Sequence, residues 1–255
     1  MRLATIDLSF HHAAAGLVMA TLARHGVAVE EWRRPHEAAF ELLADGTADA
    51  LCAAWLPGSH GKYFEPLAEH FEGISVMYTP YALWGVPDYV PAERVSSVAD
   101  LTRLDVVARM TKRIQGIGPG AGISRFSREI MEAYGLEQYG YRFENGSLAD
   151  CVNAFEQAVA EKRWVVVPLW QPQYLHATHR IRELHEPNGL LRGRDEATLI
   201  IRKSTLEQLP VSAADALRRL SPGNADITQL DRWIACEGMT PLQAGERYLQ
   251  RGVAD

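Results

Sequence analysis

The chain has 255 residues, of which 47% are hydrophobic and 23% charged, and its formal net charge is −6. This composition is typical of a globular protein with room for one large domain or two lobes. The negative charge and the lack of a basic run argue against nucleic acid as a partner. No stretch reaches the roughly 20 apolar residues that a membrane span needs.

The first third alternates strands and helices. We expect strands at residues 3–8, 27–32 and 48–54, and helices at residues 13–24 and 35–44. Gly26 is the expected C-terminal cap of the first helix. Strands separated by single helices predict right-handed βαβ units and a parallel sheet.

The rest of the chain repeats this pattern. Strands are expected at residues 73–78, 115–118, 141–143, 164–169 and 197–201, and helices at 125–134, 147–161, 206–220, 227–237 and 241–252. Ser124 is the expected N-cap of the helix at 125–134, and Ser147 is expected to begin the helix at 147–161. The sequence therefore predicts an α/β protein with two lobes, residues 1–83 with 197–255 and residues 84–196. Crossovers are expected near residues 80–90 and 197–202.

Two features bear on the environment of the chain. Its three cysteines, Cys52, Cys151 and Cys236, are far apart, so no metal or redox motif is indicated and buried free thiols are expected. The first residues lead directly into a strand and do not resemble a signal peptide. The mature protein is therefore cytoplasmic, or a leader was removed.

Two tryptophans occupy matching places in the two predicted lobes. Trp55 and Trp170 each begin a Trp-x-Pro sequence, and each is expected directly after a strand. Ligands of open α/β sheets bind beyond the carboxyl ends of the strands. An exposed indole face attracts a cation, and a quaternary ammonium lacks strong hydrogen-bond donors, so aromatic faces are its natural partners. The pair therefore indicates a methylated ammonium site, with Tyr78 and Tyr81 as candidates to complete it.

Several segments, in order, resemble the glycine betaine/proline betaine substrate-binding proteins of ABC transporters. They are the turn at residues 6–10, the phrase at 39–49, Trp-Leu-Pro-Gly-Ser-His at 55–60, Gly-Val-Pro-Asp-Tyr-Val at 85–90, residues 96–101, Gly-Ala-Gly-Ile at 120–123, residues 164–174 and residues 238–244. The resemblance spans nearly the whole chain.

The resemblance implies a type II periplasmic-binding-protein fold, whose two lobes close on a ligand held in the cleft. It implies a transport protein for osmoprotection rather than an enzyme, located in the periplasm or otherwise outside the cytoplasm. The ligand is glycine betaine, choline, carnitine or a similar amine, the partner is an ABC transporter permease, and the protein is a monomer without a cofactor or metal. The site residues implied are Trp55, Trp170, Phe10, His11, His60, Gln173, Tyr81, Gly120 and Ala121.

Five of these residues have roles or departures that the resemblance makes specific. Trp55 and Trp170 cover the cationic head, and backbone amides near Phe10 and His11 hold a carboxylate at a helix N-terminus. Gln173 stands where the family has a histidine, and Phe10 stands where it often has a tryptophan. These departures indicate an incomplete cage.

Two alternatives remain open. An enzyme on the same two-lobed fold would use His11, His12 and Cys52 for catalysis, with a nucleophile and a base within hydrogen-bond reach. A cytoplasmic ligand sensor is the other alternative. His60 is expected to bond either a neighbouring turn or the ligand.

Overall fold

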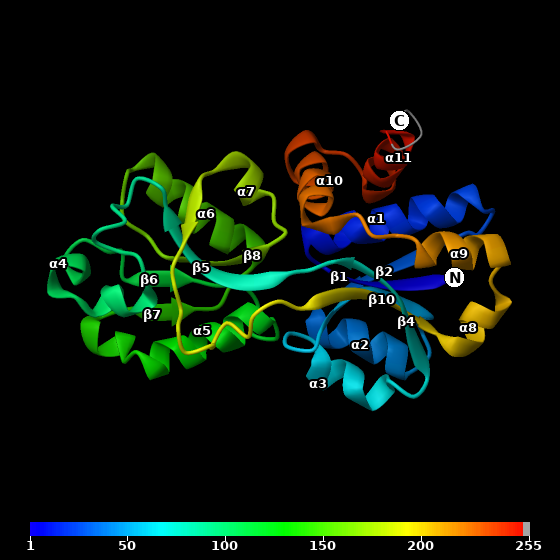
Figure 1. Ribbon diagram of the computed structural model, residues 1–255, viewed down its shortest axis with the longest axis horizontal. Coiled ribbons are helices and arrows are strands. Elements are labelled where there is room, and N and C mark those ends of the chain that lie inside the picture. The colour runs from blue at the N-terminus through cyan, green and yellow to red at the C-terminus, as the bar shows by residue number, and fades with distance from the viewer. Residues whose placement is uncertain (252–255) are drawn as a thin grey trace. The chain divides into compact units, whose positions relative to one another are not determined.

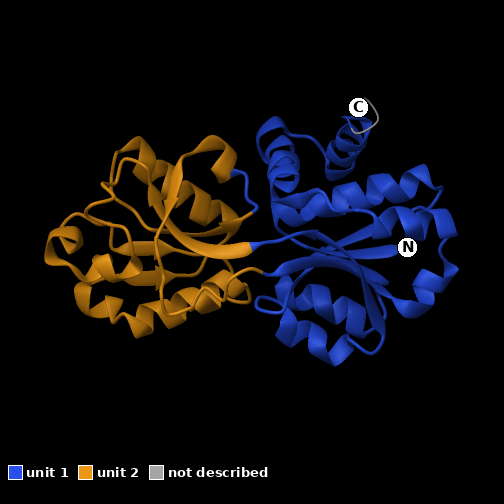
Figure 2. Cartoon of the chain, in the orientation of Figure 1, with its two compact units in different colours: residues 1–80, 172–174, 195–255 blue, residues 81–171, 175–194 orange. Residues whose placement is uncertain are grey.

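The computed structural model describes residues 1–251, and the chain divides into two compact units. Unit 1 comprises residues 1–80, 172–174 and 195 onward, and unit 2 comprises residues 81–171 and 175–194 (Figure 2). The predicted lobes, residues 1–83 with 197–255 and residues 84–196, differ in detail. Residues 172–174 return to unit 1, and the first boundary lies at residue 80. The expected end of the last helix, at residue 252, and the expected end of the first lobe, at residue 255, lie outside the described residues.

The sheet of unit 1 has five strands in the order β2-β1-β3-β10-β4. They are β1 (Arg2–Ile6), β2 (Glu30–Arg34), β3 (Ala50–Leu56), β4 (Phe71–Tyr78) and β10 (Glu196–Arg202). The first three pair in parallel, as βαβ units require, whereas β10 runs antiparallel to β3 and β4. The predicted parallel arrangement of the first three strands is confirmed, and only β10 runs against the other four strands, because it enters the sheet from unit 2 rather than through a crossover helix.

Helices cover both faces of this sheet. One face carries α1 (Ser9–Arg24), α9 (Val211–Arg218), α10 (Gly223–Glu237) and α11 (Pro241–Arg251), and the other carries α2 (His36–Ala44) and α3 (Gly61–Phe64) (Figure 1). The helix expected at 206–220 is two helices, α8 (Lys203–Gln208) and α9, because Pro210 cannot continue a helix. The expected cap Gly26 is confirmed, with φ +74°.

Helix α1 begins four residues earlier than expected, at Ser9. His11 and His12 are therefore in its first turn and not in a strand-exit loop. Most of α1 is buried, including the whole run Ala13–Val18. It meets α11 so closely that a β-carbon on Gly16 would lie 2.0 Å from the carbonyl oxygen of Pro241. One on Gly245 would lie 2.3 Å from the oxygen of Gly16, so only glycine fits either position.

Unit 2 contains a three-stranded antiparallel sheet, β8-β5-β9, and a parallel pair, β6-β7. The strands are β5 (Tyr81–Pro87), β6 (Arg113–Gln115), β7 (Arg142–Glu144), β8 (Val167–Gln171) and β9 (Ile181–Glu183), and the last was not predicted. The helices are α4 (Leu104–Val107), α5 (Gly122–Ala133), α6 (Leu148–Ala160) and α7 (Leu175–Thr178).

The two serines expected at helix starts have different outcomes. The helix predicted to begin at Ser147 is α6, and Ser147 caps it in a capping box with Asp150. Ser124 is not a cap, because α5 begins at Gly122 with Ala121 as its N-cap. The Ser124 hydroxyl instead donates to the carbonyl oxygen of Ile117 at 3.0 Å, bracing the preceding loop.

The three cysteines differ in their burial. Cys52 and Cys151 are buried free thiols, but Cys236 is exposed, so the expectation that all three are buried is wrong. Its place near the end of α10, after the last buried residue Trp233, explains the exposure.

Within residues 1–251, no helix combines the length and the apolar character needed to cross a bilayer.

Candidate functional site

Trp55 is the next-to-last residue of β3, so it lies within the strand rather than after it. His60 fixes its backbone from both sides. The Trp55 N–H donates to His60 Nδ1 at 2.9 Å, and the His60 N–H donates to the Trp55 carbonyl oxygen at 2.8 Å. His60 is expected to bond either a neighbouring turn or the ligand, and the structure instead shows a bond to the backbone of strand β3. Its imidazole holds the tryptophan in place.

The Trp55 ring lies in an aromatic cluster, which we define as Phe10, His11, Trp55, His60 and Tyr78. The centroid of the indole is 5.2 Å from Phe10, 5.5 Å from His11 and 6.2 Å from Tyr78. Its Nε1–H donates to the Tyr78 hydroxyl at 3.0 Å. This bond satisfies the polar edge of the indole, so the ring is held by its edge and its backbone.

His11 is uncharged in this setting. It is 1% exposed, and burial lowers its pKa well below the ordinary value, with His60, His36 and His12 adding smaller effects in the same direction. An imidazole without a positive charge does not repel a cationic ligand. The cluster therefore offers aromatic rings, and His11 adds no competing charge to them.

The turn after Trp55 is held by a residue that the sequence did not single out. Asp195 accepts from the backbone N–H of Gly58 at 2.6 Å and of Ser59 at 3.0 Å. Its own N–H donates to the carbonyl oxygen of Pro80 at 2.7 Å. Because Asp195 lies more than 130 residues from this turn, no local pattern could have indicated it.

The predicted carboxylate site at the start of α1 is partly revised. The His11 N–H donates to the Leu8 carbonyl oxygen at 3.0 Å, so this amide is already engaged. Leu8 caps the helix without a side-chain hydrogen bond, and the first turn has no acidic residue. The positive end of α1 is thus not compensated within its own turn. Phe10, 2% exposed, stays with Trp55 in the cluster.

Gln173 is fully buried and belongs to unit 1, in the short segment 172–174. The next residue is anchored to α10, because the Tyr174 N–H donates to Asp231 Oδ2 at 2.8 Å. Asp231 is also fully buried. Burial raises its pKa to about 7, against the opposing effects of Ser9 and Tyr174. The one signal in the sequence that could have indicated Asp231 is weak: a carboxyl group beside the apolar helix positions Ile227 and Leu230.

The other predicted residues lie in unit 2. Trp170 is the next-to-last residue of β8, pairs with Ala82 of β5 and is 2% exposed. Its carbonyl oxygen is 3.0 Å from His176 Nε2. The two tryptophans therefore occupy the same place in their strands, one in each unit.

Tyr81 makes a hydrogen bond and a cation–π contact within unit 2. Its hydroxyl donates to Glu183 Oε1 at 2.8 Å, and the guanidinium of Arg194 lies 4.5 Å from the centroid of its ring. Burial and Glu183 raise its pKa to about 12, so it stays protonated. Because a cation already covers one face of this ring, Tyr81 is a weaker candidate for the cage than Tyr78.

Gly120 and Ala121 form the turn before α5. Ala121 donates its N–H to the Gly118 carbonyl oxygen at 3.1 Å, and the Gly120 carbonyl oxygen accepts from Arg125 at 2.6 Å. Arg128 reaches the Pro119 carbonyl oxygen at 3.2 Å. The loop is therefore braced by the first two turns of its own helix.

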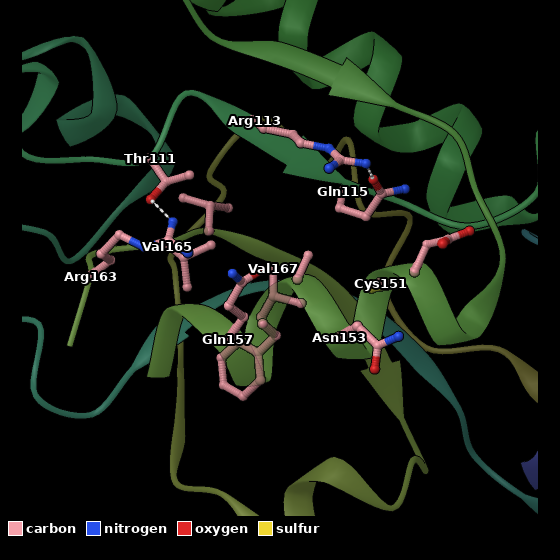
Figure 3. A pocket seen from close by; sticks show the side chains of 13 residues that line it. Thr111, Arg113, Gln115, Cys151, Asn153, Gln157, Arg163, Val165 and Val167 are labelled. Atoms are coloured by element: carbon pink, nitrogen blue, oxygen red, sulfur yellow. Dashed lines mark hydrogen bonds between the residues drawn. The ribbon is translucent and has the colours of Figure 1, made fainter. Parts of the chain in front are cut away.

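Unit 2 also contains a cavity of about 230 Å³ beside α6, β6 and the start of β8 (Figure 3). None of the predicted site residues lines it. Arg113 and Arg163 reach its wall, bonded to Gln115 and Thr111. Asp150 also lines the cavity, and each guanidinium pairs with a glutamate, Arg113 with Glu144 and Arg163 with Glu161, so the wall carries charges of both signs.

The surroundings of Cys52 bear on the enzyme alternative, which would use its thiol as a nucleophile. Its Sγ contacts Met77 Sδ at 3.5 Å, and burial raises the pKa of the thiol far above its ordinary value. Such a thiol stays protonated and unreactive. Among residues 1–251, no group of three His, Cys, Asp or Glu side chains is placed to hold a metal ion.

Comparison with known proteins gives one family. Residues 1–251 match the model of the substrate binding domain of ABC-type glycine betaine transport systems. The glycine betaine/carnitine transport binding protein of Listeria monocytogenes is 23% identical over 146 residues, which are 57% of this chain and 48% of that protein. The match thus spans about half the length of the relative.

Solved structures agree on the fold. Lactococcal OpuAC, closed on glycine betaine, has a TM-score of 0.85 at 21% identity, covering 99% of this chain and 96% of its own. A choline-binding protein of an ABC transporter, solved with choline, has a TM-score of 0.83 at 15% identity, covering 99% and 88%. At these identities the likeness establishes the two-lobed α/β binding-protein fold.

Proposed function

Since the chain belongs to the family of substrate binding domains of ABC-type glycine betaine transport systems, we propose that its own ligand is a small methylated ammonium compound. Glycine betaine, choline and carnitine are the leading candidates. The observation that carries this proposal is the aromatic cluster around Trp55, in which the neighbouring imidazole of His11 is uncharged.

Trp55 is the proposed contact for the cationic head in unit 1. A quaternary ammonium spreads its charge over methyl groups, which pack on an indole face and gain about 0.5–2 kcal/mol from the ring. His60 and Tyr78 fix the indole before the ligand arrives. A ring that is already oriented loses less entropy on binding, so pre-organisation adds to affinity.

The remaining residues have proposed roles around the cation and its tail. Trp170 is the proposed aromatic contact from unit 2, with the Gly120–Ala121 turn as a backbone contact. Gln173 is the proposed donor to a polar tail, and the start of α1 attracts a carboxylate because its positive end has no acidic partner in the first turn. Tyr81 is kept as a secondary candidate.

The proposed mechanism is reversible binding without covalent chemistry. The ligand-bound protein is then recognised by an ABC transporter permease, outside the cytoplasm. We propose a monomer that needs no cofactor. A buried, protonated Cys52 thiol supports this reading over an enzyme on the same fold.

Titration calorimetry with glycine betaine, choline and carnitine tests the proposal. Glycine, which has the carboxylate of glycine betaine but no methyl groups, is the matched control ligand. We expect at least one methylated amine to bind and glycine not to bind. A protein that binds none of the three amines, or that binds glycine equally well, would contradict the proposal.

A further inference from the structure

A buried carboxyl group lies beside the start of α1 and is not part of the aromatic cluster. Asp231 comes from α10, is fully buried, and is reached by Ser9, the first residue of α1. The effect of Ser9 lowers the pKa of Asp231, although neither Ser9 Oγ nor Asp231 Oδ1 has a partner of normal hydrogen-bond geometry within residues 1–251. A buried oxygen left in this state is costly and calls for an explanation.

The same carboxyl group also holds the segment that contains Gln173. Its Oδ2 accepts the Tyr174 N–H at 2.8 Å, 57 residues away in sequence. Asp231 therefore contacts the two pieces of unit 1 that are proposed to hold the tail of the ligand: the first turn of α1, and residues 172–174. A charge on Asp231 therefore acts electrostatically on the first turn of α1 and on residues 172–174.

We propose that Asp231 is a specificity-determining residue of unit 1: protonated, it admits a ligand carboxylate at the start of α1, and ionised, it disfavours that carboxylate and favours an ammonium ligand with a neutral tail. The inference rests on the proposed function. Two carboxylates that share a site cannot both ionise without cost, whereas a cation favours the ionised form.

The groups around Asp231 leave it as the residue that changes charge near neutrality. The titratable and charged residues on the elements packed against α10 are Glu72 and Tyr78 on β4, His11, His12 and Arg24 on α1, and Glu246, Arg247, Tyr248 and Arg251 on α11. Burial, with Asp231 as a smaller cause, raises the pKa of Tyr78, and burial lowers the pKa of His11 well below its ordinary value and also lowers the pKa of His12. Tyr78 and His11 therefore keep their charge state between pH 6 and 8.

On α11, Arg247 and Arg251 lie over the ring of Trp233, and the hydroxyl of Tyr248 donates to Asp226. Burial raises the pKa of Asp231 to about 7, so its proton is lost between pH 6 and 8. Because the ionised Asp231 disfavours a ligand carboxylate, we expect glycine betaine to bind more weakly as pH rises from 6 to 8. We do not expect this of choline, which has no carboxylate.

The test is titration calorimetry of the whole chain with glycine betaine and with choline at pH 6, 7 and 8. In the wild type we expect the ratio of the two dissociation constants, betaine over choline, to rise about tenfold, the change that one unit of pKa perturbation produces. In Asp231→Asn the ratio stays constant, since the amide keeps an acceptor for Tyr174 but does not ionise. Asp226→Asn, on the same helix, keeps the wild-type rise.

Proton linkage gives a second readout that does not need a variant. Calorimetry in two buffers of different ionisation enthalpy measures protons exchanged on binding at pH 7. We expect uptake with glycine betaine and release or no exchange with choline. A constant ratio in the wild type, equal proton exchange for both ligands, or an unchanged rise in a folded Asp231→Asn would each overturn the inference. If no methylated amine binds at any pH, the proposed function itself fails.

Discussion

The indole N–H of Trp55 donates to the hydroxyl of Tyr78 at 3.0 Å, and the two rings meet at 86°. The bond joins the indole near the end of β3 to the last residue of β4. These two strands are not neighbours, because β10 lies between them in the sheet. It fixes the plane of the indole, which decides whether a methylated cation meets the face of the ring or its edge.

Removing this bond weakens ligand binding. In Tyr78→Phe the indole N–H loses its partner while the packing stays, so we expect the dissociation constant to rise about 3- to 10-fold, equivalent to one hydrogen bond of about 0.5–1.5 kcal/mol. Calorimetry measures it. Tyr89→Phe in unit 2, which loses a hydroxyl bonded to the Arg163 carbonyl oxygen, is the control and should leave affinity unchanged. Equal affinity in wild type and Tyr78→Phe would contradict the role of the bond.

Trp55 itself contributes through its face. Trp55→Leu keeps an apolar side chain but loses the ring, and we expect affinity for any methylated amine to fall about 30-fold, for a loss of about 2 kcal/mol. Trp32→Leu on the edge strand β2 is the control, since Trp32 lies under the guanidinium of Arg34. A Trp55→Leu protein that binds as tightly as the wild type would exclude Trp55 as the cation contact.

Asp195 supports the turn that carries His60. Asp195→Ala leaves the N–H groups of Gly58 and Ser59 without their acceptor, and Ser59 is buried. We expect a loss of stability of about 1–3 kcal/mol together with weaker binding. Urea denaturation and calorimetry measure the two effects. If stability falls and affinity does not, the turn has no part in placing Trp55.

The protonation of Asp231 makes stability depend on pH. Its pKa rises from an ordinary 3.8 to about 7, so the folded chain holds a proton that the unfolded chain has lost across this interval. Stability therefore falls as pH increases from about 4 to 7 and is constant above it, by up to about 4 kcal/mol. Asp231→Asn removes this contribution, so it should be more stable than the wild type at pH 8 and comparable at pH 4.5. Denaturation curves that differ equally at both pH values would contradict the assignment.

The contact between α1 and α11 admits no side chain. Gly16→Ala places a methyl group 2.0 Å from a backbone oxygen, which a side-chain rotation cannot relieve. We expect a loss of about 1–3 kcal/mol or more, measured by thermal unfolding. In Gly61→Ala the nearest atom would be 4.0 Å away, at the Pro57 side chain, so this variant is the control. Similar melting temperatures for the two variants would show that α11 moves freely.

Local sequence patterns predicted most of the elements of the fold. Alternating apolar strands and helices located β1, β3, β8 and α1, and the glycine at position 26 marked a helix end. The patterns did not reveal the direction of β10, because an antiparallel strand and a parallel one have the same apolar composition. The short strand β9 has three residues and no strong periodicity.

Some of the residues predicted for the site lie together in the structure, and others do not. Trp55, Phe10, His11 and His60 lie together in unit 1, as a strand end followed by a helix start would place them. Asp195 and Asp231 act on distant backbone N–H groups, and a carboxylate that bonds a partner more than 50 residues away leaves no local spacing to read. The role of His60 was undecided until its bond to the Trp55 backbone was seen.

The packing of α1 against α11 also constrains how the chain can fold during synthesis. Residues 9–24 are covered by residues 241–251, which follow much later in the sequence. During synthesis the apolar helix α1 therefore lacks this cover until α11 has also been made, and domains normally fold as units. Unit 1 can complete its core only when both of these distant segments are present.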